Sequence, residues 1–267
     1  MQLLGDLAAW HILALGIFLL FLQFIAREAG FWYGQRSLNA NVKKDEGVNV
    51  IVGAILGLLA FVLALNLSVA TSRTAERRLT SLQEANAIGT SWLQATAFGP
   101  GHGETIANLL KSYADERLAY IQADRDSPMI TEAIAKTSEL QTQIWGHLIV
   151  LLRDNPGPQS TALMTSLNTT FDASTAMRFA MIYTIPPQLL WLLLALNLCG
   201  MGALGYQFGL IGKHHRWLTT MMNILLTVLL VEIVDLGNAR LGNFRGDTLA
   251  YAWTEQSFQP IPIPTAP

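Results

Sequence analysis

The sequence predicts an all-α polytopic membrane protein, with four transmembrane helices and a soluble antiparallel four-helix bundle between spans two and three. The chain is 51% hydrophobic and only 13% charged, whereas a typical soluble domain carries about 25% charged residues. The apolar residues gather in four long stretches. Between the second and third stretch, apolar residues recur instead at the period of an amphipathic helix.

Net charge, cysteine count and the absence of known motifs exclude several classes of function. The net charge is −2 and no basic block occurs, so nucleic acid is not expected as a partner. The single cysteine excludes an intrachain disulfide, and the five histidines show no metal-ligand spacing. No Gly-rich phosphate loop, Gly-x-Ser-x-Gly or His-Glu-x-x-His motif occurs. We therefore expect no cofactor, no metal site and no enzymatic activity.

Span one is expected at about residues 7–26. No Lys or Arg precedes it and no small-residue cleavage site follows it, which predicts an uncleaved anchor rather than a signal peptide. A short loop over residues 27–47 is expected to join it to span two.

Span two is the first half of one long helix, expected at about residues 48–98. Residues 48–70 contain no charged side chain, and they are long enough to cross a bilayer core of about 30 Å. No Gly or Pro interrupts residues 75–88, and the first strong breaker is Gly99-Pro100-Gly101. The helix is therefore expected to continue from lipid into water.

Small and polar residues line one face of span two at a spacing of three or four. In lipid, small residues let helices approach closely, because burying leucine against leucine gains nothing over lipid tails. This face either packs against another helix or lines a central pathway. Its members are the pore-lining candidates: Asn49, Gly53, Gly57, Ala60, Ala64 and Ser68.

The bundle is expected to contain the second half of the long helix and three further amphipathic helices, at about residues 104–124, 129–153 and 159–183. Breaks at residues 126–128 and 155–158 separate them. Four helices return the chain to the membrane face from which it left, ready to begin span three. The expected domains are residues 1–70 for spans one and two, 71–185 for the bundle, 186–237 for spans three and four, and 238–267 for a C-terminal tail with an extended, proline-rich end.

Spans three and four, at about residues 187–208 and 217–235, also carry small and polar residues. Asn66 of span two and Asn197 of span three are expected to form interhelical hydrogen bonds or, alternatively, to bind a ligand. Small residues on span three suit close helix packing: Ala195, Cys199, Gly202 and Gly209. Span four carries a polar stripe: Thr220, Asn223 and Thr227.

A charge cluster is expected at one membrane interface. A carboxylate within a span is a functional hypothesis whose partner should be named, and here the partners are arginines. The cluster is either a salt bridge that ties span four to the long helix or an ion-attracting or gating ring. Its members are Arg73, Arg77, Glu232, Asp235 and Arg240.

Charge also bears on the orientation in the plasma (inner) membrane. The short loops carry six Lys and Arg residues, and the membrane-proximal parts of the other side also carry six. Because no Lys or Arg precedes span one, the positive-inside rule favours short loops inside. The bundle and both termini are then outside.

Residues 84–93 form an unusual stretch of the bundle, because Asn86 and Gly89 weaken a helix interior. We expect Gly89 to let a neighbouring helix, such as the one that carries Trp145, approach closely. A small-ligand pocket at this stretch is the alternative.

The chain resembles a bacterial family of bestrophin-like membrane proteins of uncharacterised function. The most specific shared run is Glu84-Ala-Asn-Ala-Ile-Gly89. Gly237 and Ala239 depart from the family pattern, which often has Asp and Pro there. The other shared motifs lie between about Gly47 and Gly242: Gly57-Leu-Leu-Ala-Phe61 leading into Ser68, Tyr113-x-x-x-Arg117, Leu167-Asn168 with Asp172, and Asp235-Leu236 with Arg240 and Gly242.

Bestrophins have a similar plan and are pentameric anion channels whose second span lines the pore neck. The resemblance therefore implies a homo-oligomer in the lipid bilayer, small anions as permeating species, and a cytosolic bundle, contrary to the charge argument. The predicted function is an oligomeric ion channel, with anions as the expected permeating ions, or a channel-like pore, with span two lining the axis. The alternative is a membrane-anchored sensor or scaffold whose bundle binds a ligand or partner.

Overall fold

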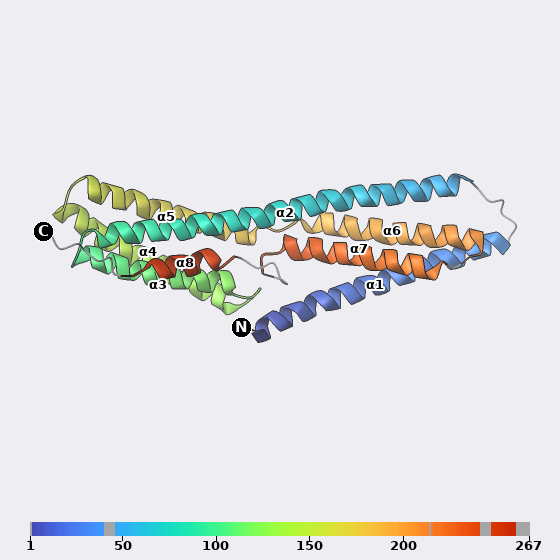
Figure 1. The fold of residues 1–267 in the computed structure, drawn as a ribbon, viewed down its shortest axis with the longest axis horizontal. Coiled ribbons are helices and arrows are strands. Elements are labelled where there is room, and N and C mark those ends of the chain that lie inside the picture. Colours follow the sequence, from blue (N-terminus) through green and yellow to red (C-terminus); the bar gives the residue numbers. More distant parts are fainter. Residues whose placement is uncertain (1, 40–45, 214, 241–246, 260–267) are drawn as a thin grey trace. The chain divides into compact units, whose positions relative to one another are not determined.

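The computed structural model describes residues 2–39, 46–213, 215–240 and 247–259. Within these residues the chain is all-α and contains no strand, as predicted (Figure 1). It forms two compact units, residues 1–74 with 184–244 and residues 75–183 with 245–267, called here the membrane unit and the bundle unit. The helices are α1 (Gln2–Asn39), α2 (Glu46–Thr96), α3 (His102–Gln122), α4 (Pro128–Asp154), α5 (Pro158–Ile182), α6 (Pro187–Ile211), α7 (Arg216–Gly237) and α8 (Leu249–Ser257).

Four helices are long and apolar enough to cross a membrane. The candidate spans are Ile12–Leu38, Gly47–Thr96, Gln188–Ile211 and Arg216–Gly237. The chain is therefore an integral membrane protein. The predicted long helix is also present, since α2 runs from Glu46 to Thr96 without a break (Figure 1).

The predicted end of span one at residue 26 is wrong. Helix α1 continues to Asn39 through the segment expected to be a loop. The charge that suggested a loop is accommodated, because Arg27 is only 4% exposed and donates to hydroxyl groups of α7. Two glycines of this segment, Gly30 and Gly34, lie directly against the backbone of α6. Lys43 and Lys44, also assigned to that loop, lie outside the described residues.

Glycines bring α1 and α6 into backbone contact. A Cβ added at Gly30 would lie 2.0 Å from the carbonyl oxygen of Gly202, and one added at Gly209 would lie 2.3 Å from that of Phe31. Neither position can accept a larger residue without moving a helix. The prediction that Gly202 and Gly209 serve close packing is confirmed, and their partner is α1. The same prediction is wrong for Ala195 and Cys199, which are exposed.

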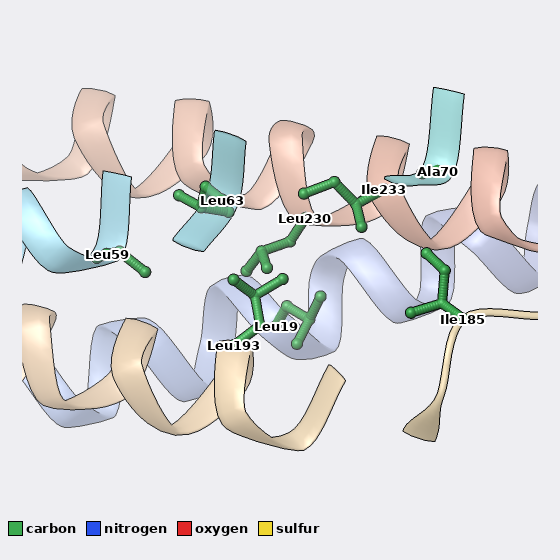
Figure 2. Packing of buried hydrophobic residues seen from close by; sticks show 8 residues of the cluster. All are labelled: Leu19, Leu59, Leu63, Ala70, Ile185, Leu193, Leu230 and Ile233. Carbon is green, nitrogen blue, oxygen red and sulfur yellow. The ribbon is translucent and has the colours of Figure 1, made fainter. Parts of the chain in front are cut away.

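An apolar cluster holds the four membrane helices together (Figure 2). Because lipid is as apolar as leucine, this cluster contributes close van der Waals packing rather than removal of apolar surface from water. Its buried members are Leu19 of α1, Leu59, Leu63 and Ala70 of α2, Ile185, Leu193 of α6, and Leu230 and Ile233 of α7.

The bundle unit contains the second part of α2 followed by α3, α4 and α5. Short connections join these helices, as expected for antiparallel neighbours. The helix α4 begins where the sequence predicts, because Ser127 accepts a hydrogen bond from the Met129 amide and Pro128 occupies the first turn. Helices α2 and α5 are joined by the hydroxyl pair Ser91 and Thr170, 2.8 Å apart.

The bundle unit also contains α8, which the sequence did not predict. Thr254 of α8 donates to the carbonyl of Ala85, at 3.2 Å, and its methyl group lies 3.5 Å from the position of a Cβ on Gly89. Gly89 therefore accommodates α8, and the prediction that it faces the helix of Trp145 is wrong. The proline-rich end, residues 260–267, lies outside the described residues.

Candidate functional site

The membrane half of α2 has one packed face and one open face. Leu59, Leu63 and Ala70 are at most 2% exposed and contact the other membrane helices. A helix turns by about 100° per residue. With this rotation, Gly57 and Phe61 point to within about 40° of the direction opposite the packed face.

All six pore-lining candidates lie on the open side of α2: Asn49, Gly53, Gly57, Ala60, Ala64 and Ser68 are exposed. A Cβ added at Gly53 or Gly57 would meet nothing within 4 Å. The small-residue face therefore does not pack against another helix in the described part of the chain. One member has a polar contact, since Asn49 accepts a hydrogen bond from Gln207 of α6 at 2.9 Å.

The open side is not uniform. Ala60 and Ala64 border an apolar groove of about 360 Å³ between α2 and α7. Gly57, Phe61 and Ser68 lie further from α7 and point away from the packed face. The candidates thus divide into groove residues and residues that face directly away from the unit.

The charge cluster is placed only in part. Asp235 is 3% exposed and Glu232 is half-buried near the end of α7. The Thr74 hydroxyl of α2 donates to the carbonyl of Leu236 at 2.9 Å, which brings the segment of Arg73 to the segment of Asp235. Arg73, Asp235 and Arg240 each have an interaction partner. Arg77 is buried and belongs to the bundle unit, and the ring itself stays a prediction.

The sequence analysis missed a buried polar contact between α1 and α7. Arg27 donates from Nη1 to the hydroxyls of Thr219 and Thr220, both at 3.0 Å, and from Nη2 to Glu28 at 2.7 Å. Gln23, one turn earlier, donates to Thr227 at 3.0 Å. A signal was present, because residues 23, 27, 30 and 34 are small or polar at helical spacing and mark one continuous face beyond residue 26.

The two buried asparagines do not form the expected interhelical hydrogen bonds. Asn66 donates to the carbonyl of Val62 in its own helix, at 2.9 Å. Asn197 has no hydrogen-bond partner for either side-chain atom among the described residues. That prediction is wrong for both residues in the described chain.

A buried ion pair occupies the centre of the bundle unit. Glu84 of α2 is fully buried and accepts hydrogen bonds from Nε and Nη2 of Arg117, and from the phenol of Tyr251 on α8. Burial, together with the Glu84 charge, raises the pKa of Tyr251 well above its ordinary value. Burial, the largest single influence, lowers the pKa of Arg117, but the charge and hydrogen bonds of Glu84, together with the nearby tyrosines, outweigh it, so the pKa is raised. Because Arg117 of α3 and Tyr251 of α8 both donate to this one carboxylate of α2, the contact is suited to holding α8 in place.

A cavity of about 310 Å³ lies at the junction of α2 and α3 in the bundle unit. It is lined by Trp92 of the unusual stretch, and by Glu104, Asn108 and Lys111 of α3. The Lys111 ammonium lies 5.6 Å from the centre of the Trp92 ring. Its volume is at the lower end of the range for small-molecule sites.

Comparisons with known proteins identify the fold. No protein-family model and no curated protein sequence matches the chain. A bacterial bestrophin homologue from Klebsiella pneumoniae aligns with a TM-score of 0.69 and 14% identity over 91% of this chain and 96% of its own. Two single-residue variants of that homologue align with TM-scores of 0.68 and 0.67, at 14% and 13% identity, over 92% and 93% of this chain and 96% and 97% of theirs. The chain therefore has the fold of bacterial bestrophin homologues.

Proposed function

We propose that the chain is one subunit of a symmetric homo-oligomer that forms an anion-permeable pore, with α2 around the axis. The shared fold with bacterial bestrophin homologues covers 91% of the chain and supports this proposal, because bestrophins are pentameric anion channels. The proposed oligomer is accordingly a pentamer.

The open face of α2 is the observation that carries the proposal. The exposed faces of the other spans carry large apolar side chains, such as Phe18 and Phe21 of α1 and Leu225 of α7, as expected for surfaces in lipid. The open face of α2 also exposes large apolar side chains, among them Val50, Phe61 and Leu65, but they alternate there with exposed glycine, alanine, serine and asparagine. Such residues are typical of helices that meet one another closely or line a polar path.

Phe61 is the proposed constriction. Its side chain is 61% exposed and points away from the packed face, with Gly57 one turn before it. A ring of such side chains in an oligomer would form an apolar neck that gates by loss of water. Residues 47–70 contain no Asp or Glu, so no carboxylate on this part of α2 repels anions.

Chloride flux into proteoliposomes tests the proposal. The purified wild type is expected to conduct, and Phe61→Ala should raise the flux by opening the neck. The matched control is Phe18→Ala, an equally exposed phenylalanine on α1 at 56%, which should leave the flux unchanged. No wild-type flux from a well-folded oligomer, or equal effects of the two variants, would overturn the pore.

Gly57→Trp tests the same face in the opposite direction. A Cβ at Gly57 meets nothing within 4 Å in the subunit, so the variant should fold. The bulky side chains would then obstruct the axis of the oligomer. We expect an oligomer of unchanged size by light scattering with lower flux, and undiminished flux from such an oligomer would contradict the assignment of α2 to the axis.

The cavity beside Trp92 supports the second candidate, a sensor whose bundle binds a small ligand. Glu104 and Lys111 give the cavity one charge of each sign, which suits a zwitterionic molecule. Quenching or a shift of Trp92 fluorescence by small amino acids, absent in Lys111→Met, would favour this function. If the spectrum is unchanged and chloride flux has been measured, the sensor function is rejected and the pore is the one remaining candidate.

A further inference from the structure

Four buried amide side chains in the membrane unit have polar atoms without a hydrogen-bond partner among the described residues. Gln23, Asn197 and Asn223 are at most 2% exposed, and Asn66 is 5% exposed. The unpaired atoms are Gln23 Oε1, Asn66 Oδ1, Asn223 Oδ1 and both polar atoms of Asn197. A polar atom buried in the hydrocarbon region is costly unless it is paired, and it calls for an explanation.

Two of these residues meet through Thr227. Gln23 of α1 donates from Nε2 to the Thr227 hydroxyl at 3.0 Å, and Asn223 lies one turn from Thr227 on α7. The Thr227 hydroxyl itself donates to the carbonyl of Asn223 at 2.8 Å. Its oxygen can therefore only accept from the NH₂ group of Gln23, which fixes the orientation of that amide. Gln23 Oε1 is consequently left without a donor among the described residues.

The helix register brings Asn197 to the same level. Helices α1 and α6 run in the same direction, since Gly30 lies against Gly202 and Gly34 lies against Gly209. Stepping back along both helices from these contacts places Asn197 within about one turn of Gln23.

The adjacent apolar layer agrees with this register. Leu19, Leu193 and Leu230 lie together in the membrane core (Figure 2). Each is one turn from a polar residue, namely Gln23, Asn197 and Thr227 respectively. The four residues Gln23, Asn197, Asn223 and Thr227 therefore form the next layer, called here the polar centre.

The chemistry of the unpaired atoms selects the occupant. An anion would face the acceptor oxygens of Gln23 and Asn223. A cation would lie near the guanidinium of Arg27, one turn from Gln23, and would be repelled. Water donates to the oxygens and accepts from the NH₂ group of Asn197, and it carries no charge. We propose that ordered water occupies the polar centre and bridges these amides.

A small cavity lies at the loop end of the same contact. A cavity of about 10 Å³, the size of one water molecule, lies beside Arg27, Thr219 and His215. The hydroxyls and amides of α1 and α7 continue from there to the polar centre. The leucine layer closes the path on the other side, so the water reaches only part of the way through the unit.

Radiolytic labelling of the wild-type protein in nanodiscs tests the proposal. X-ray pulses convert bound water to hydroxyl radicals in place, and methionine beside that water is oxidised. Met201 is the reporter, because it is fully buried and one turn from Asn197. Met177 and Met181 of the bundle unit are equally buried and serve as dry references. We expect Met201 to be oxidised several-fold faster than both, and equal protection of all three would overturn the proposal.

A matched pair of variants locates the water. Asn197→Leu should reduce Met201 oxidation to the level of the references, because it removes a polar group from the centre. Asn66→Leu removes a buried amide of α2 whose Oδ1 is also unpaired but which is not part of the polar centre, and it should leave Met201 oxidation unchanged. An equal decrease in both variants, or no decrease in either, would contradict the polar centre as the site. Asn223→Leu provides the same test where Asn197→Leu fails to fold, and neither result depends on ion conduction.

Discussion

Replacing Tyr251 by phenylalanine removes one oxygen atom from the buried centre of the bundle unit. Glu84 is fully buried, and the Tyr251 phenol donates to its Oε2 at 2.5 Å, while Arg117 donates to both of its oxygens. Phenylalanine keeps the ring, so no large cavity forms. The loss is one hydrogen bond to a charged group, worth about 1.5–3 kcal/mol of the free energy of unfolding. For a unit of this size that corresponds to a decrease in Tm of roughly 5–12 °C.

Thermal unfolding of the protein in nanodiscs, followed by tryptophan fluorescence, measures this effect. The control is Tyr33→Phe, which removes an exposed phenol from α1. In a Glu84→Gln background, Tyr251→Phe should cost less, since a neutral hydrogen bond contributes about 0.5–1.5 kcal/mol. A loss below about 0.5 kcal/mol, the range of ordinary surface substitutions, would refute the view that Tyr251 anchors α8 through a charge-assisted bond.

Three further results are expected. Gly205→Ala should destabilise the membrane unit by about 1–3 kcal/mol, because the added Cβ would lie 2.1 Å from the Arg27 carbonyl oxygen, and the fraction surviving heating in detergent measures this. Burial first, and then Glu84, raise the pKa of Tyr251 in the folded protein. Its neutral form therefore stabilises the fold fully below about pH 10, which is the pKa of tyrosine in the unfolded chain, and this stabilisation is lost as the pH rises towards the pKa in the folded protein. Above about pH 10, Tm should therefore fall more steeply in the wild type than in Tyr251→Phe. A cysteine at Gly157, in a chain with Cys199→Ser, should be labelled by an impermeant maleimide from one side of the membrane only, and that side is the side of the bundle.

Each of these predictions has a control. Gly146→Ala adds a Cβ where nothing lies within 4 Å, so it should not change heat resistance, and equal losses in the two glycine variants would contradict the packing argument. Parallel pH dependence in wild type and Tyr251→Phe would remove Tyr251 as the titrating group. A cysteine at Lys213, in the loop before α7, should react from the opposite side to Gly157, and labelling of both from one side would rule out the four-span topology.

Helix boundaries were largely predictable because they depend on local signals. The breakers at Gly99-Pro100-Gly101 and Pro158 lie where α2 ends and α5 begins. Between residues 75 and 88 no glycine or proline stops α2, and it continues as expected. Such residues act through their own backbone, so their effect can be predicted without knowledge of the tertiary structure.

Tertiary partners were not predictable in the same way. Arg27 looked like a loop residue because its Thr219 partner is 192 positions away. Gly89 was predicted to need a close neighbour, but nothing local indicated that Thr254 of α8 would be that neighbour. Among the pore-lining candidates the spacing identified a real face of α2, although one chain alone does not reveal what that face meets in an oligomer.

The contacts among the membrane helices differ in how freely they can adjust. Helices α1 and α6 touch through backbone atoms at Gly30 and Gly209, and α1 is tied to α7 by hydrogen bonds of Gln23 and Arg27. Such contacts form only at one relative position of the two helices. The three helices α1, α6 and α7 therefore form one rigid group.

Helix α2 contacts these three helices in a different way. Its buried contacts are made by Leu59, Leu63 and Ala70. Its hydrogen bonds to α6 and α7 at Asn49 and Thr74 lie on either side of these apolar contacts. Leucine side chains can exchange rotamers as a helix turns, whereas abutting backbones cannot. A rearrangement within the membrane unit is therefore a rotation of α2 over its leucine contacts, while α1, α6 and α7 keep their positions.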